Sequence, residues 1–147
     1  MVDEHVATQK LKEIVRRIAR ARMLCPADPE GFAEDENAVE LVSFNLLLAV
    51  QACIDLATHL IADESWEPAA TAREALERLQ ERGVVSEETV RALRKAIGFR
   101  NFVAHGYSGV DPMQVHSAAA SGLADLERFA AEVSTWIEGR AATPAGQ

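Results

Sequence analysis

The sequence has 147 residues, of which 48% are hydrophobic, 26% are charged and only 5% are aromatic, and its formal net charge is −8. This length suits one domain that buries its own core, and two cysteines without a C-x-x-C pair exclude a disulfide or zinc framework. No uninterrupted apolar run reaches the roughly 18 residues of a membrane span, and the charged amino end does not resemble a secretory signal, so we expect a cytoplasmic protein with no membrane contact.

The charges are unevenly distributed along the chain. Six bases and three acids in residues 1–24 give +3, nine acids and no base in residues 25–65 give −9, and residues 66–110 and 111–147 sum to +1 and −3. This distribution excludes a uniformly basic nucleic-acid-binding face, so a nucleic acid would have to bind locally. The basic cluster within residues 16–22 is explained most simply as a solvated helix face.

Apolar residues recur at intervals of three and four along most of the chain, which predicts helices and no strands. The predicted elements are a helix over 4–24, a loop over 25–35, a long helix over 38–60, a short polar helix from Pro68 to Arg82, a helix from Ser86 through His105, and a helix from Asp111 to Gly139. The apolar stripe of the long helix is wider than one neighbour would cover. Contacts on two of its sides are therefore expected, and a second subunit is one candidate for the second contact.

Boundary residues support these predictions. Gly83 suits a left-handed helix stop, and Asp111 followed by proline suits a cap and a first helical position. Short links place consecutive helices antiparallel. The sequence therefore predicts an all-α fold, an antiparallel four-helix up-and-down bundle with a short additional helix, over residues 1–139, followed by a flexible C-terminal tail over 140–147.

One stretch, GFRNFVAHGYSGVD at residues 98–111, carries more polar chemistry than a helix end needs. Asn101 and His105 are four residues apart and share a helix face, whereas Arg100 lies about 140° from His105 around the axis. Two routes can reunite Arg100 with His105. The long arginine stem can sweep around the helix, or a second copy can supply the partner group across a two-fold axis.

These side chains suit cleavage of an RNA phosphodiester by the neighbouring 2'-hydroxyl. His105 can accept or donate a proton near neutral pH, Arg100 can grip two phosphate oxygens, and Asn101 can orient the phosphate or the imidazole. A structural reading is also open, in which the histidine caps helix carbonyls and the arginine forms a surface ion pair. Spacing alone does not decide between the two readings.

The run G-F-R-N-x-x-x-H-G-Y with a following aspartate resembles the signature of HEPN-domain proteins of the HepT-like toxin group, as does QACIDLATHLIA in the second helix. The resemblance implies a dimeric, metal-independent endoribonuclease toxin with Arg100 and His105 catalytic and Asn101 supporting them in a cleft on the dimer axis. It also implies a minimal nucleotidyltransferase antitoxin as partner, which in some similar systems transfers AMP to the tyrosine that Tyr107 matches.

Other candidates receive smaller roles. Asp55 can pair with His59 four residues further on, or support the site by reaching Arg100 and holding its guanidinium. The four histidines have no metal-ligand spacing, so we expect no metal and no cofactor. The alternative function is a non-catalytic helical interaction module that binds a nucleotidyltransferase partner. A third option is a dimeric scaffold with a polar helix end. No DNA binding is expected from the domain itself.

Overall fold

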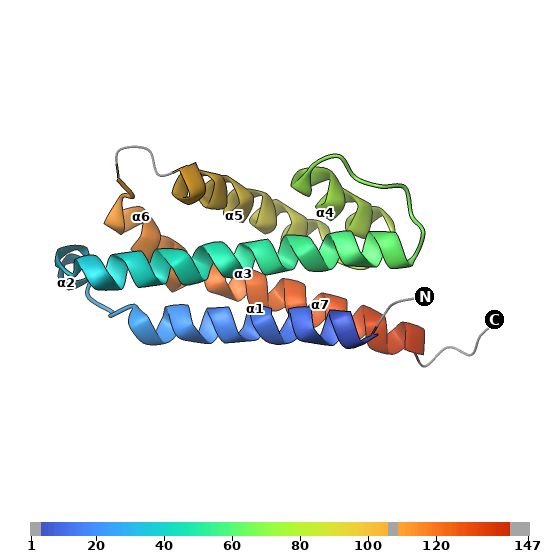
Figure 1. The fold of residues 1–147 in the computed structure, drawn as a ribbon, viewed down its shortest axis with the longest axis horizontal. Helices are drawn as coiled ribbons and strands as arrows, with labels where there is room; N and C mark the ends of the chain where they lie inside the picture. Colours follow the sequence, from blue (N-terminus) through green and yellow to red (C-terminus); the bar gives the residue numbers. More distant parts are fainter. Residues whose placement is uncertain (1–3, 106–108, 142–147) are drawn as a thin grey trace.

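The computed structural model describes residues 4–105 and 109–141 (Figure 1). Its elements are α1 (Glu4–Leu24), α2 (Pro29–Glu34), α3 (Glu36–Asp63), α4 (Ala72–Glu81), α5 (Glu87–His105), α6 (Pro112–Ser117), a π-helical turn η1 (Ala118–Gly122) and α7 (Leu123–Ala141). The described residues contain no strand. The prediction of an all-α fold is therefore confirmed.

Four long elements form the bundle. In Figure 1, α1, α3, α5 and the continuous α6–η1–α7 element alternate in direction along the long axis of the molecule, with α3 in the centre. The short helix α4 packs on α3 and α5, while α2 packs on α3 and α6 at the opposite end. The architecture is the predicted four-helix up-and-down bundle, with α4 as the predicted short helix.

The core lies around α3, whose long apolar face meets α1 on one side and α5 and α7 on others. Ile14, Leu56, Leu93 and Phe129, from four different helices, are each fully buried at 0% exposure. By length and composition α3 would also suffice to cross a membrane, yet 61% of its most apolar window is buried inside the bundle. Packing within the domain accounts for this apolar character.

The predicted loop over residues 25–35 is wrong, because α2 occupies most of it. Asp28 caps this helix by accepting hydrogen bonds from the backbone N–H of Glu30 and Gly31, at 3.2 Å each. Pro29 stands at the first helical position, where its missing N–H costs nothing. The helix places Phe32 in the core at 0% exposure, so this segment contributes to the packing of the bundle.

The predicted start of the short helix at Pro68 is also wrong. α4 begins at Ala72, because Thr71 Oγ1 accepts a hydrogen bond from Glu74 N at 3.1 Å and Glu74 Oε2 accepts one from Ala70 N at 2.8 Å. The pair resembles a capping box, with the N–H of the residue before the cap, Ala70, as the second donor. At the other end Gly83 has φ +73°, so the predicted left-handed stop is confirmed.

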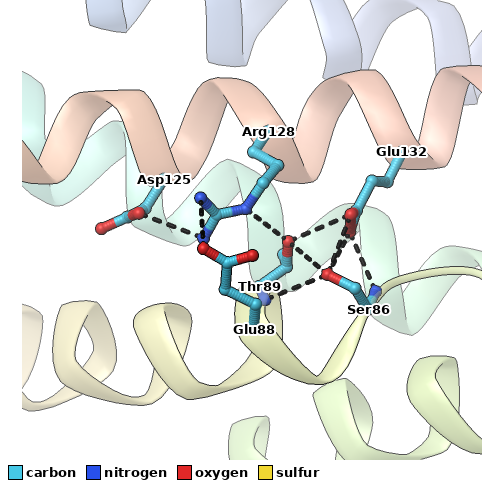
Figure 2. Close-up of polar contacts among 6 residues, drawn as sticks. All are labelled: Ser86, Glu88, Thr89, Asp125, Arg128 and Glu132. Carbon is cyan, nitrogen blue, oxygen red and sulfur yellow. Dashed lines mark hydrogen bonds and ion pairs between the residues drawn. The ribbon is translucent and has the colours of Figure 1, made fainter.

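A polar network fixes the start of α5 against α7 (Figure 2). Ser86 Oγ caps α5 by accepting from Thr89 N at 3.2 Å, and Glu132 of α7 accepts from Ser86 N at 2.9 Å. The Thr89 hydroxyl, fully buried, donates to Glu132 Oε2 at 3.2 Å and accepts from Arg128 Nε at 2.9 Å. Arg128 also pairs with Asp125 and Glu88. These bonds hold α5 against α7 at the end opposite the candidate site.

The last long element begins as predicted and then departs from a regular α-helix. Asp111 Oδ1 accepts from Met113 N at 2.9 Å, and Pro112 is the first helical residue. The turn over Ala118–Gly122 is π-helical, and Val115 and Leu123 remain buried on either side of it. The helix continues to Ala141, past the predicted end at Gly139.

Candidate functional site

The candidate site lies where the second half of α5 passes the middle of α3. Arg100 and Asn101 come from α5, and Gln51 and Asp55 come from α3, one helical turn apart. The two helices pack against each other over this region. Hydrogen bonds connect all four side chains.

The Arg100 guanidinium is folded back onto its sequence neighbour. Asn101 Oδ1 accepts hydrogen bonds from Arg100 Nε at 3.1 Å and from Nη2 at 2.7 Å. Positions 101 and 105 share a helix face, so this contact bends the arginine side chain toward that face of α5. The His105 side chain and Tyr107 lie outside the described residues, so convergence of Arg100 and His105 by either of the two routes stays a prediction.

Gln51 holds the other edge of the guanidinium. Arg100 Nη1 donates to Gln51 Oε1 at 3.0 Å, and Gln51 Nε2 donates to Asp55 Oδ1 at 2.9 Å. Lys10 of α1 follows, with its Nζ 3.6 Å from Asp55 Oδ2. Asp55 thus reaches Arg100 through Gln51 and does not hold the guanidinium directly. Sequence reasoning missed Gln51, because a glutamine inside an amphipathic helix carries no distinguishing signal.

Arg100 differs from other arginines of the bundle in the chemistry of its partners. Arg22, Arg94 and Arg128 each form ion pairs with carboxylates. Arg100 is bound by amide oxygens, and no carboxylate in the described part of the chain forms an ion pair with it. Three of the five N–H donors of a guanidinium are used in these bonds, which leaves two for an anionic ligand. The positive charge is held in place without being neutralised.

The remaining polar residues of α3 do not join this site. His59 Nε2 lies 2.9 Å from Asp63 Oδ2, so His59 pairs with Asp63 and not with Asp55. Cys53 is fully buried, and burial raises the pKa of its thiol, which removes it as a nucleophile. Within residues 4–105 and 109–141, no group of three His, Cys, Asp or Glu side chains could hold a metal ion.

Fold and site together define an all-helical bundle in which two amide oxygens hold an arginine that has no carboxylate partner among the described residues. A family model described as ribonuclease HepT-like matches residues 5–133, and the chain belongs to this family. The resemblance to the HepT-like group of HEPN-domain proteins is therefore confirmed.

Individual relatives agree with this assignment. The chain is similar to the mRNA nuclease HepT of Shewanella oneidensis, at 25% identity over 124 residues that cover 84% of this chain and 92% of the relative. It is 30% identical over 97 residues to a putative RNase of Archaeoglobus fulgidus, covering 66% of this chain and 73% of that protein. Its fold matches a tri-AMPylated Shewanella oneidensis HEPN toxin in complex with MNT antitoxin, with TM-score 0.82, 24% identity, and 92% and 99% of the two chains covered.

Proposed function

We propose that this chain is a metal-independent endoribonuclease toxin of a type II toxin–antitoxin pair, which cleaves RNA by 2'-hydroxyl attack in a cleft between two copies. The observation that carries the proposal is the Arg100 guanidinium, held by two amide oxygens with two donors left over. Membership in a ribonuclease family supports it, and relatives named as nucleases support RNA as the substrate.

The reaction follows from the residues in three steps. His105, acting as a base, takes the proton of the 2'-hydroxyl, whose oxygen attacks the adjacent phosphorus. Arg100 donates to the phosphoryl oxygens as negative charge grows on them, and Asn101 keeps the guanidinium in place. The bond to the 5'-oxygen breaks, and this oxygen leaves with a proton from an imidazolium, either the same His105 or that of a second copy. The products are a 2',3'-cyclic phosphate and a 5'-hydroxyl.

An exposed apolar stripe on α3 supports the homodimer. Leu41 is 45% exposed and Phe44 is 51% exposed, and the half-buried Leu48 continues the same helix face to Gln51. Large exposed apolar side chains arranged in this way are typical of a protein interface. A two-fold axis near this stripe would bring two copies of Arg100 to one groove, as the dimer-cleft proposal requires.

The partner in this proposal is a minimal nucleotidyltransferase antitoxin. The similar Shewanella oneidensis toxin is described as tri-AMPylated and in complex with MNT antitoxin. AMP on Tyr107 would add bulk and negative charge two residues beyond His105 and repel an RNA backbone. Both proteins would act in the cytoplasm, in agreement with the free thiols of Cys25 and Cys53.

The test expresses the chain with Arg100→Ala or His105→Ala and follows both growth arrest and cleavage of total RNA with EDTA present. Loss of the proton-transfer group of His105 lowers the rate by about 10²–10⁴. Loss of the Arg100 donors to the growing phosphoryl charge lowers it by about 10²–10³, so we expect both variants to lose toxicity and cleavage. Arg91→Ala is the matched control, because Arg91 lies on the exposed side of α5 and pairs only with Glu87 among the described residues. Cleavage that persists in the His105 variant would disprove the assignment. Cleavage that stops with EDTA would disprove metal independence.

A second candidate function is a non-catalytic module that binds a nucleotidyltransferase. The net charge of −8 and the nine acids of residues 25–65 favour it, since RNA-binding surfaces are usually basic. Under this function, purified protein would leave every transcript intact while still forming a complex with the partner. A co-purification experiment combined with the cleavage assay separates the two functions.

A further inference from the structure

We propose that Gln51 is a positioning residue that holds the Arg100 guanidinium while leaving its positive charge available to the RNA phosphate, and that Asp55 sets the orientation of the Gln51 amide. This inference rests on the proposed function and extends it to a residue on a second helix. It explains why the Gln51 amide contacts the Arg100 guanidinium at a position where a carboxylate would form a stronger bond.

The hydrogen bonds allow only one orientation of the Gln51 amide. The guanidinium of Arg100 can only donate, so it requires the amide oxygen, and the ionised carboxylate of Asp55 can only accept, so it requires the amide nitrogen. The distances are 3.0 Å from Arg100 Nη1 to Gln51 Oε1 and 2.9 Å from Gln51 Nε2 to Asp55 Oδ1. A reversed amide would break both bonds. Asp55 therefore fixes the end of Gln51 that faces Arg100.

The amide also separates two opposite charges. A carboxylate in direct contact with Arg100 would bind it strongly and would compete with a phosphate for the same donors. With Gln51 between them, Asp55 acts on Arg100 only through a neutral group. Lys10 lies 3.6 Å from the other oxygen of Asp55 and compensates part of its charge, which reduces its repulsion of an incoming phosphate.

Three substitutions separate positioning from charge. Gln51→Glu keeps the shape and can still accept from Arg100, but it loses the bond to Asp55, as Gln51→Leu does, and in addition places a negative charge at the guanidinium. Gln51→Leu removes the bond and adds no charge. Asp55→Asn keeps the size of the side chain but allows either amide orientation at Gln51. Gln80→Glu is the matched control, because it makes the same change of charge at an exposed position of α4.

The measurement uses full-length protein and a short fluorescein-labelled RNA of mixed sequence. Binding is followed by fluorescence anisotropy in the His105→Ala background, and kcat and KM are measured with His105 present. We expect Gln51→Glu to weaken binding and raise KM by about tenfold, more than Gln51→Leu does, although glutamate is closer to glutamine in shape. Gln51→Leu and Asp55→Asn should lower kcat by about three- to tenfold with a smaller change in binding. Gln80→Glu should stay within about twofold of the parent protein.

The outcomes distinguish this inference from the function on which it rests. If binding and cleavage depend on Arg100 but Gln51→Glu matches the parent protein, the role of Gln51 is wrong and the nuclease stands. If Gln51→Leu weakens binding more than Gln51→Glu does, Gln51 is a structural contact and the charge argument fails. If the parent protein neither binds nor cleaves RNA, the proposed function fails, and the inference fails with it. Circular dichroism of each variant confirms that the bundle is folded.

Discussion

Replacing Thr89 with valine tests whether the polar network between α5 and α7 stabilises the bundle. The substitution keeps the shape of a side chain that is 0% exposed but removes its hydroxyl. That hydroxyl accepts from Arg128 Nε at 2.9 Å and donates to Glu132 Oε2 at 3.2 Å, and both partners are charged. Hydrogen bonds to charged groups contribute about 1.5–3 kcal/mol each. Arg128 keeps Asp125 and Glu132 keeps Ser86, so we expect a net loss of about 2–3 kcal/mol.

Urea denaturation followed by circular dichroism measures this loss. With an m-value of about 2 kcal/mol/M, the midpoint should fall by about 1 M or slightly more. Thr135→Val on the exposed side of α7 is the matched control and should change the free energy of unfolding by less than about 0.5 kcal/mol. A Thr89→Val midpoint within the error of the control would refute the reasoning, because it would mean that the charged partners find equal bonds elsewhere.

Three further predictions concern the thiols, an ion pair and a turn. Burial raises the pKa of both thiols, more strongly for the fully buried Cys53 than for the half-buried Cys25. Iodoacetamide at pH 8 should therefore modify Cys25 first and Cys53 only when the protein unfolds, and mass spectrometry measures this order. The hydrogen bond from Arg22 lowers the pKa of Glu127 in the folded protein. The stabilisation of the fold by this ion pair is therefore present above the unfolded pKa of about 4.3 and is lost as the pH falls through the lower pKa of the folded state. Glu127→Gln should therefore cost up to about 1 kcal/mol at pH 7 and nothing measurable at pH 2, and a pH-independent cost would contradict this. Gly83→Ala should cost about 1–2 kcal/mol in the same urea assay because φ is +73°, and an unchanged midpoint would disprove the strain.

The helix starts show how far local chemistry carries a prediction. Asp111 followed by Pro112 identified a helix start correctly, because a capping carboxylate and a proline at the first position act within a few residues. The same pair occurs at Asp28 and Pro29, where the density of breakers between residues 25 and 35 favoured a loop. The capping residues Thr71 and Glu74 were likewise present in the sequence, but Pro68 favoured an earlier helix start. In both errors the helix-breaking residues were given more weight than the capping residues. The capping residues alone were sufficient to locate both helix starts.

Only some contacts of the candidate site could be predicted from the sequence. Arg100 and Asn101 stand next to each other in the chain, so their association could be expected from the motif. The contact of Arg100 with Gln51 could not, because it depends on the angle and register with which α5 packs on α3. Nothing local distinguishes Gln51 from any other half-buried glutamine of a helix. The roles of His105 and Tyr107 stay predictions from the motif.

The π-helical turn between α6 and α7 absorbs one surplus residue without changing the phase of the last helix. Val115 and Leu123 are eight residues apart, which in a regular α-helix would set them about 80° apart around the axis, yet both are buried. The wider turn removes about one residue's rotation of 100° and so returns Leu123 to nearly the same side as Val115. Deleting one residue within Ala118–Gly122 should therefore leave Leu126 and Val133 in the interior, because the shortened segment closes into ordinary helix with the same face inward. A relative can thus lose this residue and still keep the packing of its last helix.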